Sequence, residues 1–580
     1  MSASTFSGRF RTLSMRAPKS SRGSRPAALA KAARAASAGA VATNPDEIRP
    51  ATREETFPIA LAAVLVSFVA LLLSFSRGYL LLYGDAVAHL GIARRILDSR
   101  NPGLIQLGGV WLPLPHLLML PFVQKLEWWQ NGLAGAWPSL ICYIASVAGL
   151  YRLARYLLVP RWAIAATAFY ALNPNLLYLS TTAMTEPLFL ALLIWTALLT
   201  VECVAAIRAA RHAVVGRRLV LVSVVILAAV YTRYDGWILG ATVWCVVTFT
   251  LARSREVWRR VVPSFVFFTL LVVAGPISWL VYNQHFFHDP LDFIRGPYSA
   301  SAIEKKTAAL GLEHYHGWHS PFWAFVYYTR TAQVDAAFWE TGFLVMAAAI
   351  GGLVLAIRRR LALSAILLWL PLPFYVYSVA YGSVPIFIPQ LWPHSYYNSR
   401  YGMEMLPALA LFALVAAQWI EKRWGQSQPL AKRLLQPIVL LLIALNTVGM
   451  MYRTPLVLKE AMNNSTTRVG FESALARQLL ALPKGSVILM YNSDHVGALQ
   501  YAGIPLRQTI NEGDYDSFQA ALAGPAEHAA YVVAIAGDPV STAVAAHPGG
   551  LTELTILCTT GQPCARIYQS DRMSSVQPKS

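Results

Sequence analysis

Long apolar runs, separated by shorter polar connectors, dominate the pattern of this chain. An α-helix needs about 20 predominantly apolar residues to cross a membrane, and runs near that length recur along the chain. They lie near 57–77, 133–154, 162–181, 184–206, 219–232, 236–252, 261–282, 338–357, 361–380, 402–420 and 434–452. The pattern predicts a mainly α, polytopic transmembrane helical core of about eleven spans.

The connectors between these runs alternate in character, and the alternation predicts how the protein crosses the membrane. Arginine and lysine gather on the cytoplasmic side of membrane proteins. Basic residues are enriched in the N-terminal tail and near 152–161, 208–218, 253–260, 358–360 and 421–433. The alternate connectors are acidic, aromatic or proline-rich and lie at 78–132, 182–187, 232–237, 283–337 and 381–401. We therefore expect a cytoplasmic N-terminus and, after an odd number of spans, a C-terminal region outside the cytoplasm.

Two of the predicted spans are short and are expected to form a hairpin. The runs 219–232 and 236–252 hold only about 14 and 17 apolar residues, fewer than a full crossing requires. The tip between them carries Arg233 and Asp235. Charges at membrane depth normally face a polar cavity, which would make these residues part of a site. The ordinary alternative is an ion pair that only stabilises a tight turn.

Three regions follow from the arrangement of these runs. Residues 1–54 are rich in Ser, Ala, Arg and Lys and lack an apolar stretch, which predicts a disordered basic cytoplasmic tail rather than a cleavable signal peptide. Residues 55–453 form the transmembrane core, and its connector 78–132 is expected to hold two interfacial helices. Residues 454–580 predict a small extracytoplasmic α/β domain. Its expected strands lie near 485–491, 529–536 and 551–557.

The composition agrees with a membrane protein. Hydrophobic residues make up 56% of the 580 positions and charged residues only 13%, against about 25% charged residues in soluble domains. The net charge of +19 lies mostly in connectors, so it indicates positive-inside bias rather than nucleic-acid binding. Among five cysteines, Cys558 and Cys564 form either a disulfide or two free thiols.

Ionisable residues that could carry chemistry gather in the connectors assigned to the outer face. Asp85 begins a predicted helix and His89 follows one turn later, so the two side chains could touch. Such a pair can act as a general base with its orienting partner, or can share a metal ion. The ordinary alternatives are a capping aspartate and an interfacial histidine. Glu186, at the outer end of a span, is either a first-turn helix charge or an acid, base or metal ligand.

A further polar group precedes the predicted span 402–420. Arg400 at the mouth of a helix suits binding of a phosphate through paired donors. His394 lies in the same aromatic stretch. The ordinary alternative for Arg400 is a snorkelling interfacial arginine that pairs with Glu404, one turn further along.

Four short motifs occur in order between the first predicted span and the span at 402–420. They are Gly84-Asp85 with Ala93-Arg94-Arg95, Met184-Thr185-Glu186-Pro187-Leu188, Thr232-Arg233-Tyr234-Asp235-Gly236-Trp237, and Ser399-Arg400-Tyr401 leading to Leu406-Pro407. Their order resembles the GT-C superfamily of integral membrane glycosyltransferases, which includes protein O-mannosyltransferases of family 39, aminoarabinose transferases of lipid A and oligosaccharyltransferase catalytic subunits. The resemblance covers roughly residues 57–420 and leaves out the chain after 453.

This resemblance implies a fold and a reaction. The fold is a helical membrane core with a long first outer loop. The reaction moves a sugar from a polyprenyl-phosphate carrier to a glycan, lipid or protein acceptor at the outer face. An acidic residue of the first outer loop acts as base or metal ligand, and Asp85 matches it. Many members have two adjacent acidic residues there, whereas Ala86 follows here, so the need for a divalent metal ion, which Asp85 and Glu186 would hold, stays open.

We therefore expect an inverting transferase of the plasma (inner) membrane in which Asp85 takes a proton from the acceptor, assisted by His89 or Glu186. The residues expected around the donor phosphate are Arg233, Asp235, His394 and Arg400. Two alternatives stay open: a transporter or flippase of lipid-linked sugars, and a non-catalytic membrane scaffold. Transporters often carry interrupted helices in two related halves, and no such repeat is visible in this chain.

Overall fold

The computed structural model describes residues 47–309, 313–424, 429–493 and 495–573. The chain divides into two units, Met1–Glu47 and Ile48–Ser580, and all described helices and strands belong to the second. The predicted tail 1–54 lies outside the described residues up to position 46. Thr52 then caps helix α2 (Arg53–Ser76) by accepting a hydrogen bond from the backbone N–H of Glu55.

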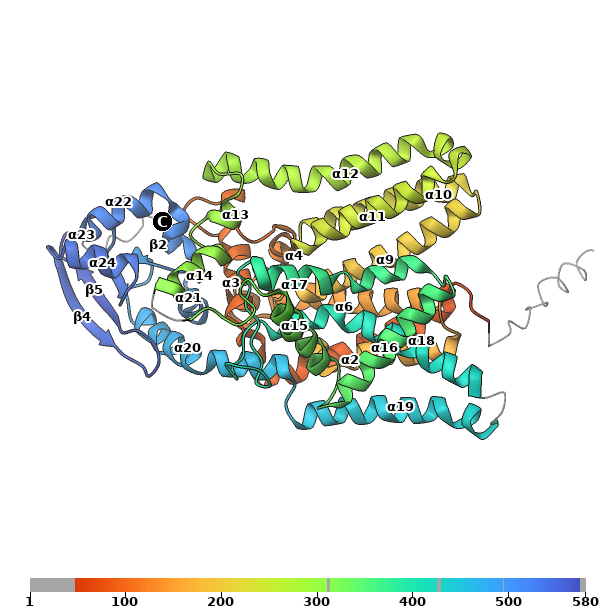
Figure 1. Ribbon diagram of the computed structural model, residues 1–580. Helices are drawn as coiled ribbons and strands as arrows, with labels where there is room; N and C mark the ends of the chain where they lie inside the picture. Colours follow the sequence, from red (N-terminus) through yellow and green to blue (C-terminus); the bar gives the residue numbers. More distant parts are fainter. Residues whose placement is uncertain (1–46, 310–312, 425–428, 494, 574–580) are drawn as a thin grey trace, which may run out of the picture. The chain divides into compact units, whose positions relative to one another are not determined.

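Within these described ranges, ten helical stretches are long and apolar enough to cross a membrane. The first six are α2, α6 (Leu133–Ala154), α9 (Glu186–Arg208), α10 (His212–Val230), α11 (Asp235–Ala252) and α12 (Arg255–Phe287). The next three are α16 (Thr341–Arg358), η3 (Leu363–Trp369) with α17 (Pro371–Tyr381), and η4 (Ser399–Met405) with α18 (Leu406–Trp424). The last, Arg433–Leu480, runs through α19 (Pro429–Tyr452) and α20 (Leu456–Leu480). The prediction of a mainly α, polytopic core is confirmed, and Figure 1 shows most of these helices running alongside one another.

One predicted span, 162–181, is not a continuous helix. The chain forms α7 (Pro160–Ala171) and then a separate short helix, α8 (Pro174–Leu179). Pro174 has no backbone N–H with which to continue α7. Asn173 instead caps α8, because its side-chain oxygen accepts from the backbone N–H of Asn175 at 2.9 Å. The count of spans is therefore ten in the described chain rather than about eleven.

The predicted hairpin of two short spans is longer than the apolar pattern indicated. Helices α10 and α11 have 19 and 18 residues. Helix α10 starts at His212 and includes Arg217 and Arg218, and arginine is a good helix former despite its charge. The helical length therefore exceeds the apolar length, and residues 231–234 make the turn between the two helices.

The first connector, residues 78–132, contains more helix than the two segments predicted for it. Its α-helices are α3 (Gly84–Arg95), α4 (Leu114–Val123) and α5 (Leu126–Asn131), and its 3₁₀ helices are η1 (Tyr79–Leu81) and η2 (Leu104–Leu107). His89 and Ile92 of α3 are buried, as is Ile96 directly after it. The second long connector holds α13 (Asp292–Arg295), α14 (Ala300–Ala309) and α15 (Pro321–Ala336).

Ion pairs join the basic connectors at one end of the core. Glu202 lies 2.8 Å from Arg218 and 3.5 Å from Arg152. Glu421 lies 3.0 Å from Arg161. Glu202 is sixteen positions along α9 from the first residue of that helix, which places it about 24 Å away along the axis. The connectors near 152–161 and 208–218 thus meet at the end of α9 opposite its start, and the pair between Arg161 and Glu421 joins the connector near 421–433 to them.

The C-terminal part of the chain forms a five-stranded sheet of order β2-β1-β3-β5-β4. Strand β1 pairs in parallel with β2 and β3, whereas β5 pairs antiparallel with β3 and β4. The strands are β1 (Ile488–Met490), β2 (Thr509–Ile510), β3 (Tyr531–Ile535), β4 (Leu551–Leu557) and β5 (Ala565–Ser570). The accompanying helices are α21 (Val496–Ala502), η5 (Leu506–Gln508), η6 (Glu512–Asp514), α22 (Asp516–Ala523), α23 (Pro525–His528) and α24 (Pro539–Ala546). The sequence pattern predicts three of these strands and misses β2 and β5.

Cys558 and Cys564 form a disulfide between the end of β4 and the start of β5. Of the two possibilities that the sequence leaves open, the structure therefore has the bridge. Figure 1 shows α20 between the sheet and the transmembrane helices, and this helix contacts both η4 and α21.

Candidate functional site

The buried guanidinium of Arg400 lies among three carboxylates from three different helices. It lies in η4, and its side chain is only 7% exposed. Its Nη2 donates to Asp85 Oδ2 of α3 at 2.5 Å, and its Nε donates to Glu186 Oε1 of α9 at 3.1 Å. Its Nη1 lies 3.4 Å from Glu460 Oε1 of α20. Segments from distant parts of the chain therefore meet at one arginine.

A second arginine, Arg233, shares one of these carboxylates. Its Nη1 lies 3.3 Å from Glu186 Oε1, the atom that Arg400 also contacts. Its Nε lies 3.2 Å from Glu404 Oε1 and 3.4 Å from Asp235 Oδ2, and its Nη2 donates to Tyr375 at 2.6 Å. We call this group the arginine cluster. Its members are Arg233, Arg400, Asp85, Glu186, Asp235, Glu404 and Glu460.

The local sequence explains how Arg233 is held. The turn after α10 is tight, because the backbone N–H of Arg233 donates to the carbonyl of Ala229 at 3.1 Å. Gly236 lies so close to the same carbonyl that a Cβ atom would collide with it. A glycine is therefore required there, and the charged tip is fixed against the end of α10.

Glu186 is placed by the start of α9. It is the first residue of that helix, and Pro187 follows, a residue that suits the first turn. The helix dipole stabilises a negative charge at this position. The side chain is 1% exposed. Glu186 thus combines the expected first-turn charge with contacts to both arginines.

Asp85 differs from the other carboxylates of the cluster in its exposure. Its side chain is 42% exposed, whereas Glu186, Asp235, Glu404 and Glu460 are all buried. Asp85 is therefore the acid of the cluster that a molecule arriving from outside can reach.

His89 does not join Asp85, although it lies one turn away on α3. Its Nδ1 lies 2.9 Å from Nε2 of His116 on α4, and its ring packs against Trp111. Burial, together with the positive charges of Arg400 and Arg233, lowers the pKa of His89 to about 3. Burial also lowers the pKa of His116 well below its ordinary value. Both rings are therefore neutral at physiological pH.

The other predicted site residues separate into two groups. Asp235 belongs to the cluster through Arg233 and accepts a hydrogen bond from the backbone N–H of Gly236 at 3.0 Å. His394 is exposed, and its Nδ1 lies 2.8 Å from the carbonyl of Pro389. In the described part of the chain, no hydrogen bond or ion pair connects His394 to either arginine. The structure brings together Asp85, Glu186, Arg233, Asp235 and Arg400.

Two carboxylates of the cluster have roles that the sequence pattern does not predict. Glu404 is expected to pair with Arg400 but contacts Arg233 instead. Both Arg400 and Glu404 lie in the 3₁₀ helix η4, where three residues complete a turn, so positions four apart point in different directions. Glu460 is absent from the predicted site altogether. The signal for it is a charge on the apolar face of α20, among the buried residues Leu456 and Val457.

The donor set of the cluster does not fit a metal ion. Among the described residues, no group of three or more His, Cys, Asp and Glu side chains is arranged to hold one. The two candidate ligands, Asp85 and Glu186, both accept hydrogen bonds from Arg400. A divalent cation between them would face a guanidinium at close range, which is electrostatically unfavourable. No step of the proposed chemistry is therefore assigned to a metal.

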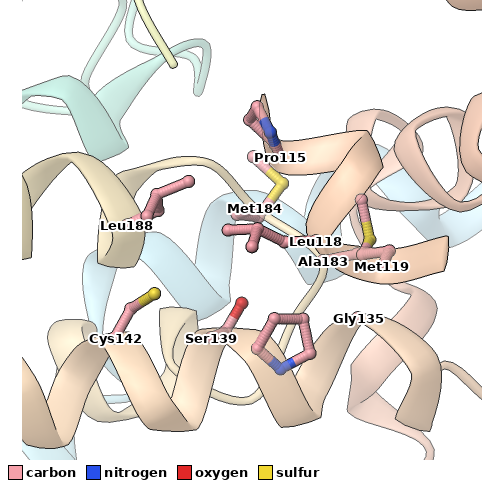
Figure 2. Close-up of a pocket in the computed structure, with 10 residues that line it drawn as sticks. Pro115, Leu118, Met119, Gly135, Ser139, Cys142, Ala183, Met184 and Leu188 are labelled. Carbon is pink, nitrogen blue, oxygen red and sulfur yellow. The ribbon is translucent and has the colours of Figure 1, made fainter. Parts of the chain in front are cut away.

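A small apolar cavity lies beside the start of α9. Figure 2 shows Ser139 and Cys142 of α6 on one side of it and Met184 and Leu188 on the other. Its volume is about 20 Å³, which is room for little more than one water molecule. Glu186 lies between two of its lining residues in the sequence, but no residue of the arginine cluster lines the cavity.

The helical core and the long helical connector after its first span are the two features expected of the GT-C fold. No family model and no curated protein matches the sequence. Among solved structures, the chain is similar to ArnT from Cupriavidus metallidurans bound to undecaprenyl phosphate, with a TM-score of 0.55 and 14% identity over 91% of this chain and 100% of that one. The apo state of the same protein gives a TM-score of 0.52 and 15% identity over 89% and 99%. The predicted resemblance is thereby confirmed at the level of the fold.

Proposed function

We propose that this chain is an integral membrane glycosyltransferase that moves a sugar from a polyprenyl-phosphate donor to an acceptor hydroxyl at the outer face of the plasma (inner) membrane. The observation that carries the proposal is the partly exposed carboxylate of Asp85, 2.5 Å from the buried guanidinium of Arg400. A proton acceptor and a phosphate-binding group are the two elements that such a transfer needs. The fold shared with ArnT, which was solved with undecaprenyl phosphate, supports the class of donor.

The proposed reaction is a single displacement. Asp85 accepts the proton of the acceptor hydroxyl while the hydroxyl oxygen forms a bond to the anomeric carbon. The bond from that carbon to the phosphate oxygen breaks, and its electron pair stays with the departing polyprenyl phosphate. Attack from the face opposite the phosphate inverts the anomeric configuration. Arg400 and Arg233 stabilise the charge that develops on the phosphate, because preorganised cations act strongly where water is scarce.

The ion pair between Asp85 and Arg400 suggests how binding leads to reaction. A donor phosphate that binds Arg400 competes with the carboxylates around it. Asp85 can leave at the lowest cost, because an exposed carboxylate regains water when its pair is broken, whereas a buried one does not. Asp85 then becomes free to accept a proton once the donor is in place.

The remaining residues of the cluster have supporting roles in this proposal. Glu186 touches both guanidinium groups and sets their spacing, while Asp235 and Glu404 hold Arg233. His89 is neutral and buried, so it supports α3 and does not take the proton. The connectors of the predicted outer side supply Asp85, Glu186, Arg233 and Arg400, and residues 454–580 are proposed to lie on that side as a domain.

The test is transfer from defined donors by the purified chain in proteoliposomes. A panel of polyprenyl-phosphate sugars is offered, and release of polyprenyl phosphate and formation of the glycoside are measured without an ion gradient. Asp85→Asn should reduce the rate by about 10²–10⁴-fold, the usual contribution of a general base. The matched control is Asp516→Asn, which removes an exposed carboxylate from the first turn of α22 and should leave the rate unchanged.

Three results would contradict the proposal. Full activity of Asp85→Asn would remove the assigned base. Movement of the intact donor across the bilayer, with no cleavage of any donor in the panel, would favour the transporter or flippase instead. If neither cleavage nor movement is found, a scaffold becomes the better description.

A further inference from the structure

We propose that helix α20 positions the two catalytic segments of the site, and that Glu460 is its positioning residue for Arg400. This inference rests on the proposed function, because it assigns a role within the same cluster. It concerns the part of the chain that lies beyond the sequence resemblance, namely the helix that begins after residue 455. The observation behind the proposal is that one helix, α20, makes hydrogen bonds to two backbone segments: the one that leads into Asp85 and the one that leads into Arg400.

The first contact holds the segment that carries Arg400. Glu460 is buried, and its carboxylate accepts the backbone N–H groups of Asn398 at 2.9 Å and Ser399 at 2.8 Å. It also accepts the hydroxyl of Ser399 and lies 3.4 Å from Nη1 of Arg400. A single carboxylate therefore fixes the entry of η4. Charged hydrogen bonds in a buried setting are among the strongest that proteins make.

The second contact holds the segment that carries Asp85. Arg468, two turns further along α20, donates to the carbonyl of Leu81 at 2.9 Å and to that of Leu82 at 3.0 Å. Near the start of α20, the hydroxyl of Tyr83 donates to the carbonyl of Val457 at 2.9 Å. These three contacts lie on the residues that lead directly into α3 and Asp85.

The far half of α20 is anchored in the sheet-containing region. Phe471 packs against His495 with ring centroids 4.7 Å apart. Helix α21 then contacts the first connector, since Gln500 donates to the carbonyl of Trp129 and Val496 faces Gly91 of α3. Helix α3 is thus held by α20 at its start and by α21 along its length. The C-terminal region has a defined task in this arrangement: it sets the distance between base and arginine.

The expected effect follows from what the substitution removes. In Glu460→Gln, one acceptor oxygen becomes an NH₂ group that faces a backbone N–H of Asn398 or Ser399. The loss of one charged hydrogen bond should free the entry of η4 and lower kcat/KM for the lipid donor by about 10- to 100-fold. The KM for the acceptor should stay unchanged. Lys459→Gln is the matched control, because it changes the charge of the neighbouring exposed residue on the same helix.

The experiment has two readouts that separate this inference from the proposed function. Hydrogen exchange of the full chain reports the amides of Asn398 and Ser399, which should exchange at least about tenfold faster in Glu460→Gln than in Lys459→Gln. Kinetics with an active donor are measured in a double-mutant cycle with Arg400→Lys. If Glu460 acts through Arg400, its substitution should cost far less in that background than in the unmodified chain.

Each outcome decides one claim. Equal exchange rates in Glu460→Gln and the control would overturn the positioning role. So would a double variant whose loss of kcat/KM is simply the product of the losses caused by Glu460→Gln and Arg400→Lys. Faster exchange in Glu460→Gln, together with a loss of kcat/KM that disappears when Arg400 is already lysine, supports the positioning role. If the unmodified chain cleaves no donor, the proposed function fails, and the exchange result alone decides whether Glu460 holds the entry of η4.

Discussion

Acidification should destabilise the first connector through its buried histidine pair. His89 on α3 and His116 on α4 lie 2.9 Å apart, nitrogen to nitrogen, and both are buried. Neither can accept a proton without placing a charge in a water-poor site. For His89 that charge would also face Arg400 and Arg233, which adds to the effect of burial in lowering its pKa to about 3.

The direction of the pH effect on stability follows from the difference in histidine pKa between the folded and the unfolded chain. An unfolded histidine titrates near 6.5, so below this pH the unfolded form binds a proton that folded His89 does not. Stability is therefore highest above pH 6.5 and falls as the pH decreases toward 3. Between pH 6.5 and pH 5, His89 alone should reduce the free energy of unfolding by roughly 2 kcal/mol. The shift of the His116 pKa has the same direction and adds to this loss.

The assay is thermal unfolding of the purified protein in detergent, at pH values from 7.5 to 5. The unmodified chain should lose several degrees over this range, and His89→Gln should lose less, because glutamine cannot take up the proton. The control is His547→Gln, which removes an exposed histidine from the C-terminal region and should keep the original slope. A flat profile for the unmodified chain, or an equal slope for His89→Gln, would refute the reasoning.

Two further predictions concern packing and the disulfide. Gly352→Ala should destabilise the core by about 1–3 kcal/mol, because the added Cβ would collide with the carbonyl of Phe412 where α16 packs against α18. Gly351→Ala is the control, since open space surrounds that position. Equal melting temperatures for the two variants would contradict this packing argument. Replacing Cys558 and Cys564 together with serine should cost about 2 kcal/mol, as expected for a short closed loop, and lower the melting temperature with no change in transfer rate. A loss of activity in the double serine variant would instead connect the β4–β5 hairpin to the site.

Much of the fold could be predicted because spans depend on local composition. A long apolar helix satisfies its own backbone, so its existence can be read from one stretch of sequence. The predictions fail where the length of a helix differs from the length of its apolar run. The run 162–181 is largely apolar but contains Asn173 and Pro174, and α10 is helical through Arg217 and Arg218. Strand β2 has only two residues, too few for any alternating pattern to appear.

Five members of the arginine cluster could be predicted from the sequence, but their pairing could not, and the reason is physical. Connectors on the same face of a membrane lie near one another. The apolar pattern assigns Asp85, Glu186 and Arg233 to connectors on one face, so the sequence alone groups them as candidate site residues. Pairing depends on the direction of each side chain. His89 faces α4 instead of Asp85 because its ring is on the buried face of α3. Glu460 lies beyond the resemblance altogether, and through its contacts with η4 the helix that follows the predicted span 434–452 also takes part in the arginine cluster.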